Sequence, residues 1–132
     1  MLAAALAVNT ALLELSVCDT RLDDSVHALA LGLASNTVLQ FLSLRNNCIG
    51  RVGAAALAAV LSHGVRSHGV QASLRPLVHL DLSHNSLGDA GVVDMASSLC
   101  GAHGLRTLQL VNCDIGSAGM PVLPARWPMQ LW

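Results

Sequence analysis

Hydrophobic positions along this chain follow two alternating periods. In four short segments, an apolar residue stands at positions one, four, six and eleven, with polar residues at most of the others. Such segments predict short strands with one buried face. The four sets, with the residue at position nine included, are Leu12, Leu15, Val17, Thr20, Leu22; Leu39, Leu42, Leu44, Asn47, Ile49; Leu77, Leu80, Leu82, Asn85, Leu87; and Leu105, Leu108, Leu110, Cys113, Ile115.

Between these strands, apolar residues recur at i, i+3, i+4 and i+7, which predicts helices with one apolar face. Because each strand and each helix has one apolar face, the two bury these faces against each other, and the stacked strands pair in parallel. Leu2, Ala3 and Leu6 fit the end of such a helix, so we expect the chain to begin inside a repeat. The complete helical sets are Val26, Leu29, Ala30, Leu33; Ala54, Leu57, Ala58, Leu61; and Val92, Met95, Ala96, Leu99.

This unit resembles the leucine-rich repeat family, and its Ile-Gly or Leu-Gly step before a G-A-x-x-L-A-x-x-L helix is similar to the ribonuclease-inhibitor subfamily. The resemblance implies an α/β fold, a right-handed solenoid with parallel strands on the concave face and helices on the convex face. It also implies a ladder in which the residue at position nine hydrogen-bonds the backbone of adjacent turns, a position that Thr20 and Cys113 fill less fully than asparagine. We expect Gly50, Gly88 and Gly116 to mark the turn after each strand, where the lack of a Cβ relieves the backbone.

One domain is expected over residues 1–132. Its second repeat is ten residues longer than its neighbours, and the excess lies within 62–76, where a Ser-His-Gly-Val segment occurs twice in tandem. An exposed loop tolerates such an insertion because closure entropy grows slowly with loop length. The predicted division is 1–11 as the end of a partial repeat, 12–38, 39–76 and 77–104 as repeats, and 105–132 as a degenerate last repeat with a tail.

The last repeat carries Pro121, Pro124 and Pro128 where a helix is expected, and three prolines cannot share a helix interior. Either the tail 124–132 covers the last repeat as an irregular cap, or a longer array ends here. Repeat arrays need polar caps for solubility, and neither end supplies one. We therefore expect a fragment with flanking domains, or self-association through the uncapped ends.

Composition narrows the function classes. The chain holds 7 Arg, no Lys and 8 acidic residues, for a net charge of -1. This balance offers no basic surface for nucleic acid or an anionic membrane, and the lack of lysine excludes P-loop and Schiff-base chemistry. No apolar run is long enough for a membrane helix, and no cofactor is expected. The four cysteines lack paired C-x-x-C spacing, which favours a reduced, cytoplasmic setting.

The side chains between the buried strand positions are predicted to point out of the concave face, and they form columns across the sheet. The face is mostly polar, with Phe41, the only phenylalanine, beside Arg45, a pairing that interface hot spots favour. An incidental surface aromatic is the alternative interpretation. The residues predicted to bind a partner are Glu14, Ser16, Phe41, Ser43, Arg45, His79, Asp81, Ser83, His84, Thr107 and Gln109.

Three chemical hypotheses for these and other residues have less support than partner binding. His79 and Asp81 with Ser43 or Ser83 have the residue types of a hydrolytic triad, but an open face lacks the pocket and oxyanion hole that a triad needs. His63 and His68 suggest a metal site, yet no third ligand is placed by the sequence. A reactive thiol at Cys18 lacks a neighbouring base, so an inert thiol is favoured.

The resemblance implies a non-catalytic protein-interaction module, as in the repeat regions of ribonuclease inhibitors and NOD-like receptors. The alternative is a regulator of a small GTPase, because Ran GTPase-activating proteins contain similar repeats, and an arginine can act at another protein's active site. No arginine of this chain lies in a motif that matches the latter family. The arginines considered are Arg21, Arg45, Arg51 and Arg106.

Overall fold

The computed structural model describes residues 2–62, 77–99 and 104–122, which form helices and strands in strict alternation. Predicted strands and helices are present in each repeat but the last, which has a 3-10 turn in place of a helix. The elements are α1 (Leu2–Val8), β1 (Glu14–Ser16), the 3-10 helix η1 (Asp23–Ser25), α2 (Val26–Ser35), β2 (Phe41–Ser43), α3 (Arg51–Ser62), β3 (His79–Asp81), α4 (Gly88–Leu99), β4 (Thr107–Gln109) and the 3-10 helix η2 (Met120–Val122).

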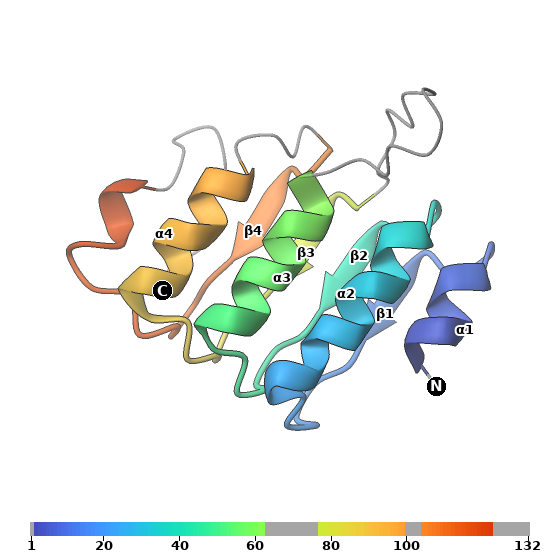
Figure 1. Cartoon of the computed structure of the whole chain (residues 1–132), viewed down its shortest axis with the longest axis horizontal. Helices are drawn as coiled ribbons and strands as arrows, with labels where there is room; N and C mark the ends of the chain where they lie inside the picture. The colour runs from blue at the N-terminus through green and yellow to red at the C-terminus, as the bar shows by residue number, and fades with distance from the viewer. Residues whose placement is uncertain (1, 63–76, 100–103, 123–132) are drawn as a thin grey trace.

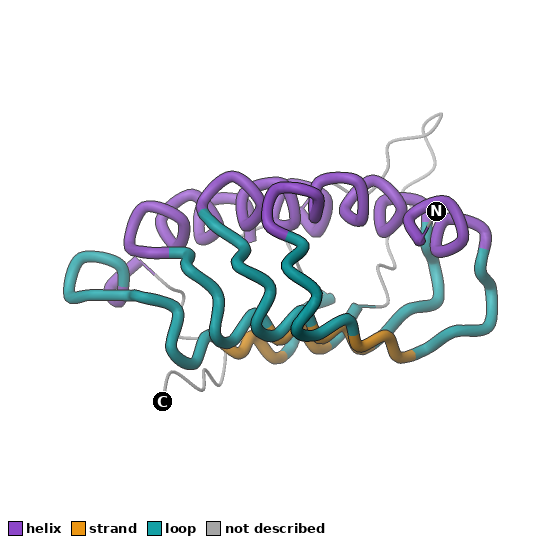
Figure 2. The backbone as a smooth tube through the Cα atoms, turned by 90° about the horizontal axis from the view of Figure 1, so that it is seen from below, coloured by secondary structure: helices purple, strands orange, loops and turns teal. Residues whose placement is uncertain are grey.

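The strands form one parallel sheet in the order β1-β2-β3-β4, and the helices cover one side of it (Figure 1). Seen along the sheet, helices form one layer and strands the other, joined by loops (Figure 2). The register is regular, with Leu15 opposite Leu42, Leu42 opposite Leu80 and Leu80 opposite Leu108. The predicted α/β solenoid is therefore confirmed.

The core lies between the two layers and is aliphatic, as the scarcity of aromatic residues requires. Leu44, Ile49, Leu57 and Leu80 are among its fully buried side chains. Leu12 differs from the equivalent leucines of later repeats, because it remains exposed at the edge of the stack. No described segment packs against the outer side of β1, so the first repeat buries less than the second.

Asparagine side chains join neighbouring repeats through a ladder of buried hydrogen bonds. Asn85 Oδ1 accepts the N–H groups of Asn47 and Ile49, at 3.0 and 2.9 Å. Its Nδ2 donates to the carbonyls of Leu44 and Leu82, at 3.0 and 2.8 Å. One side chain thus satisfies four backbone groups that would otherwise be buried without a partner.

The two substitutes at this position do less, as predicted. Thr20 donates its N–H and its hydroxyl to Asn47 Oδ1. The Cys113 thiol donates to the carbonyl of Leu82 at 3.2 Å and lies 3.6 Å from that of Val111. A thiol is a weak donor and acceptor, so the ladder weakens toward the last repeat.

The prediction for the turn glycines was wrong at two positions. Of Gly50, Gly88 and Gly116, only Gly88 has a positive φ, at 63°. Other residues adopt the left-handed conformation in two places, at the strand exit and in the turn that follows it. At the strand exit they are Asp19, Asn46, His84 and Asn112, with φ of 58°, 56°, 59° and 52°, and in the turn they are Arg21, Asp23, Cys48 and Asp114, with φ of 51°, 39°, 57° and 57°.

A second asparagine column supports the turns from helix to strand. The Asn36 side chain is buried, its Nδ2 donates to the carbonyl of Leu6 at 2.7 Å, and its Oδ1 accepts the N–H of Leu39 at 2.8 Å. Asn9 Oδ1 accepts the N–H of Leu12 in the same way. The Asn-Thr pairs at 9–10 and 36–37, one repeat apart, are the sequence signal that could have revealed this column.

Asp89, in the first turn of α4, anchors the last repeat. Its Oδ1 accepts the N–H groups of Gly116 and Gly119, at 2.6 and 3.0 Å. A Cβ at Gly119 would lie 2.6 Å from that oxygen, so a side chain there would displace Asp89. The predicted insertion within 62–76, the metal hypothesis for His63 and His68, and the tail 124–132 lie outside the described residues.

Candidate functional site

The sheet surface opposite the helices is the candidate site, and we call it the strand face. It consists of the outward side chains of β1 to β4 and of the residues that follow each strand. The parallel register aligns these side chains in columns, each of which runs across the four strands. Residues that are 27 to 38 positions apart in the sequence therefore become neighbours on adjacent strands, as the columns predicted.

The first column contains an aromatic pair. Phe41 and His79 lie opposite each other in the register, their ring centroids are 4.5 Å apart, and their planes differ by 10°. Phe41 is 41% exposed, although it is one of the larger apolar side chains of the chain. Glu14 stands next to Phe41 on β1, and Thr107 stands next to His79 on β4. The column therefore presents a stacked ring pair with a carboxylate beside it.

The second column, which begins at Ser16, consists of hydrogen-bonded polar groups, and the Cys18 thiol of the next column contacts them. The Cys18 sulfur lies 3.2 Å from the Ser16 hydroxyl and 3.5 Å from that of Ser43. The Ser43 hydroxyl is also 3.4 Å from Asp81 Oδ2. Hydrogen bonds from Ser16 and then Ser43 lower the pKa of the Cys18 thiol, because they stabilise the thiolate. Gln109 completes the column on β4.

In the third column, Ser83 does not face solvent. It is 1% exposed, and its hydroxyl oxygen accepts the N–H of Val111 at 3.2 Å. Its own N–H donates to Asp81 Oδ1 at 2.9 Å. The prediction that Ser83 contacts a partner is therefore wrong, because this side chain is buried and bound to the neighbouring repeat.

Arg45 extends across the strand exit to His84. The Arg45 Nη2 lies 2.9 Å from His84 Nε2, and His84 Nδ1 lies 3.3 Å from Asn112 Nδ2. A guanidinium only donates, so His84 accepts through Nε2 and carries its proton on Nδ1. The Asn112 amide is then best assigned with its oxygen toward the ring. Phe41 and Arg45 are both exposed on the strand face, but Arg45 reaches toward β3.

The arrangement does not support the chemical alternatives. Within residues 2–62, 77–99 and 104–122, no hydrogen bond joins His79 to Ser43, Ser83 or Asp81, and His79 instead stacks on Phe41. The same residues include no group of three or more potential metal ligands. Their cysteines are free thiols, with Cys113 buried and its pKa raised by that burial.

The helix side is the main competing surface. Leu31, Val52 and Val93 are exposed there, Val52 to 67%. They stand on three different helices, and single exposed aliphatic residues are normal on protein surfaces. Arg51 pairs with Asp94 between α3 and α4, with its Nε 2.5 Å from Oδ2.

None of the described helices is long and apolar enough to span a membrane.

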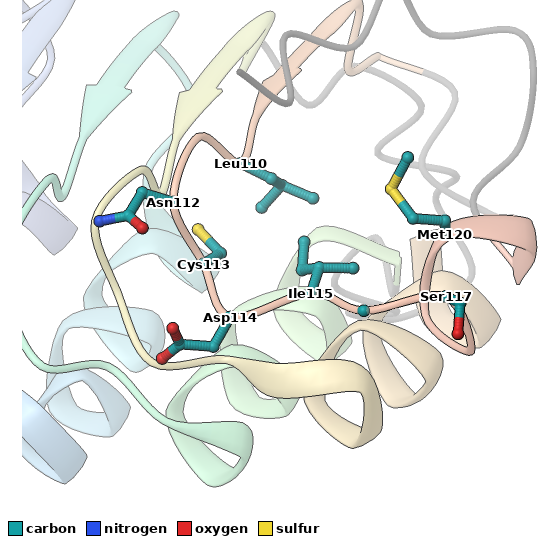
Figure 3. A pocket seen from close by; sticks show the side chains of 8 residues that line it. Leu110, Asn112, Cys113, Asp114, Ile115, Ser117 and Met120 are labelled. Atoms are coloured by element: carbon teal, nitrogen blue, oxygen red, sulfur yellow. The ribbon is translucent and has the colours of Figure 1, made fainter.

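A pocket of about 410 Å³ opens at the end of the last repeat, away from the aromatic pair (Figure 3). Leu110, Ile115 and Met120 contribute apolar surface to it, and Asn112 and Asp114 contribute polar groups. The sequence pattern does not indicate this pocket, which lies where the regular stacking of repeats ends. It shares Asn112 with the strand face, and the rest of its lining lies at the end of the stack.

Comparison with known proteins places these features in context. A family model described as a leucine-rich repeat matches residues 35–58, 73–96 and 103–122, just over half of the chain. The chain is 38% identical over 117 residues to the Tonsoku-like protein of Mus musculus, an alignment that covers 86% of the chain and 8% of that protein. It is 34% identical over 115 residues to the ribonuclease inhibitor of Sus scrofa, with 72% of the chain and 25% of that protein covered.

Among solved structures, the chain is similar to that of Leiomodin-1 actin-binding site 2. The TM-score is 0.73 at 18% sequence identity, and the match covers 91% of this chain and 67% of the other. At this identity the match shows a shared fold alone. The chain spans about a quarter or less of the length of the two curated relatives.

Proposed function

The chain belongs to the leucine-rich repeat family, and we propose that it is a protein-binding module that contacts its partner through the strand face. The name of one relative describes an inhibitor of ribonuclease, and that of the structural neighbour describes an actin-binding site. These names support protein binding as a general role. They do not identify the partner of this chain.

The exposed aromatic pair on the strand face is the observation that carries the proposal. Aromatic and arginine side chains are enriched at protein interfaces and often contribute most of the binding energy. Phe41 is 41% exposed, stacks on His79, and has polar side chains around it, which is the pattern of an apolar centre with a polar rim. Arg45 lies four residues after Phe41, two residues beyond the end of β2.

A matched pair of double variants tests the strand face against the helix side. One variant carries Phe41→Ala and Arg45→Ala, and the other carries Val52→Ala and Arg51→Ala. Each removes one exposed apolar side chain and one guanidinium, so the two changes match in charge and in kind, although the Phe41 side chain is larger than that of Val52. Proteins bound from a cell extract by the unaltered chain and by both variants are compared by quantitative mass spectrometry.

We expect the strand-face variant to lose partners that the helix-side variant retains. Truncation of a hot-spot residue costs at least about 2 kcal/mol, which is a loss of about thirtyfold in affinity. If the strand-face variant binds the same proteins as the unaltered chain, the proposal is wrong. The regulator of a small GTPase is not proposed, because no described contact of Arg45 or Arg51 favours it.

A further inference from the structure

The column formed by Glu14, Phe41 and His79 is suited to one kind of side chain. We propose that it binds an arginine side chain of the partner protein, with the guanidinium stacked on Phe41 and hydrogen-bonded to the Glu14 carboxylate. This inference rests on the proposed function, since it names the chemistry by which a partner would be recognised at the strand face. The ligand is an arginine on a protein surface or in a peptide segment.

The register leaves one face of the Phe41 ring for such a ligand. His79 covers the ring on the β3 side, in a nearly parallel stack at 4.5 Å. Glu14 is the Cα partner of Phe41 on the other side, on β1. Neighbouring strands are about 4.8 Å apart, so the Glu14 carboxylate and the second face of the ring border the same space. β1 is the outermost strand of the sheet, so this space opens to the side as well as outward.

The Glu14 carboxylate is available for a cation. It is exposed, and it forms no hydrogen bond or ion pair with any residue that the structure describes. The nearest described guanidinium on this face, that of Arg45, points along the strand exit to His84. The column itself contains no cationic lysine or arginine, because its fourth member is Thr107. An unpaired carboxylate beside an exposed ring is a complementary site for a positive charge.

Arginine fits this pair of groups better than lysine does. A guanidinium is planar and stacks on an aromatic ring, and its N–H groups donate in parallel to a carboxylate. An ammonium group is compact and strongly hydrated, so it gains less from the ring face. A phosphate or another anion is disfavoured, because Glu14 and Asp81 both lie on this part of the face.

Titration of the chain with three short peptides, followed by NMR of the labelled protein, tests this inference. The peptides are N-acetyl-Gly-Arg-Gly-amide and its analogues with lysine or citrulline, the last being planar like arginine but uncharged. We expect shifts centred on Glu14, Phe41 and His79 with the arginine peptide. Its dissociation constant should be of the order of a millimolar or weaker, as befits one side chain. The lysine peptide should bind several-fold more weakly, and citrulline should cause no localised shift.

Two charge-matched variants separate the site from general electrostatics. Glu14→Gln removes the proposed ligand of the guanidinium, whereas Asp19→Asn removes a carboxylate that accepts a hydrogen bond from Asn46 elsewhere on the face. We expect Glu14→Gln to weaken binding of the arginine peptide at least about fivefold, and Asp19→Asn to change it less than about twofold. Phe41→Leu, which keeps an apolar side chain but removes the ring, should weaken it to a similar extent as Glu14→Gln.

The inference is wrong if the arginine peptide causes no localised shifts, if citrulline binds equally well, or if the two charge variants have equal effects. Its failure can be told apart from that of the proposed function. If the Phe41 and Arg45 double variant loses partner proteins while Glu14→Gln retains them all, the strand face binds proteins but does not use an arginine at this column. If neither variant loses a partner, the proposed function fails as well.

Discussion

Replacement of Asn85 by alanine is the change that tests how the repeats are held together. The Asn85 side chain is 2% exposed and makes hydrogen bonds to the backbone of two repeats, four of them at 3.0 Å or less. A hydrogen bond of this kind contributes about 1 kcal/mol net, and a buried group left without a partner costs about 1–3 kcal/mol. Four such groups give an expected loss of about 4 kcal/mol, provided that water reaches some of them. A domain of this size is stable by only about 5–15 kcal/mol, so the loss is a large fraction.

The expected cost is smaller at Asn47, one repeat before Asn85. Asn47 Oδ1 accepts from the N–H and hydroxyl of Thr20, and its Nδ2 donates to the carbonyls of Val17 and Arg45. These hydrogen bonds are only partly buried, so water can replace some of them. We expect Asn47→Ala to cost about 2 kcal/mol. Ser86→Ala, at an exposed position next to Asn85, is the control and should change stability by less than about 0.5 kcal/mol.

Urea unfolding followed by far-ultraviolet circular dichroism measures these differences, with the slope of the transition checked for each variant. The predicted order of destabilisation is Asn85→Ala, then Asn47→Ala, then Ser86→Ala. Equal midpoints for Asn85→Ala and Ser86→Ala would refute the reasoning. That result would mean that the buried ladder contributes no more than a surface hydroxyl.

Three further changes have expected outcomes of their own. Gly32→Ala should destabilise the chain by about 1–3 kcal/mol and expose α1 to hydrogen exchange, because a Cβ there would collide with the carbonyl oxygen of Ala3; unchanged exchange in α1 would contradict this. Ser16→Ala should raise the pKa of the Cys18 thiol, so that alkylation of Cys18 by iodoacetamide slows at a given pH and its pH profile moves upward; a profile that does not move would refute the hydrogen bond. Asp89→Ala should cost about 2 kcal/mol and speed hydrogen exchange at the two N–H groups that it accepts in the last repeat; exchange as slow as in the unaltered chain would rule this anchor out.

Much of the fold could be predicted because the same apolar positions recur in each repeat of the sequence. Leu42, Leu80 and Leu108 recur at the same place in each unit, and their register in the sheet follows from that place. The buried face of each helix follows for the same reason. The role of Asn85 was also predictable, because the resemblance to the leucine-rich repeat family implies a hydrogen-bonded ladder at this position.

What could not be predicted depends on backbone conformation and on the ends of the array. The glycines after the strands suggested where the backbone is relieved, but non-glycine residues such as His84 at the strand exit and Cys48 in the following turn adopt the left-handed conformation, while Gly50 does not. Ser83 belongs to an outward column by counting, yet its side chain is buried and its hydroxyl accepts the N–H of Val111 in the next repeat. Alternation alone does not reveal this burial, because it depends on contacts with a neighbouring repeat.

Most residues of the candidate site could be predicted from the sequence, but the contacts between their side chains could not. Phe41 and His79 fall in one column by counting, and parallel pairing then makes them neighbours. That their rings stack at 4.5 Å is a property of side-chain rotamers, which the sequence does not specify. The contact of Arg45 with His84 likewise crosses two columns, so no single column of residues indicates it.

Site-specific photo-crosslinking measures most directly whether the strand face is the binding surface. Benzoylphenylalanine replaces Phe41 on the strand face in one protein and Val52 on the helix side in another, both positions being well exposed. After irradiation in cell extract, the account predicts a discrete crosslinked partner from position 41 and none from position 52. A discrete partner from position 52, with none from position 41, would contradict it.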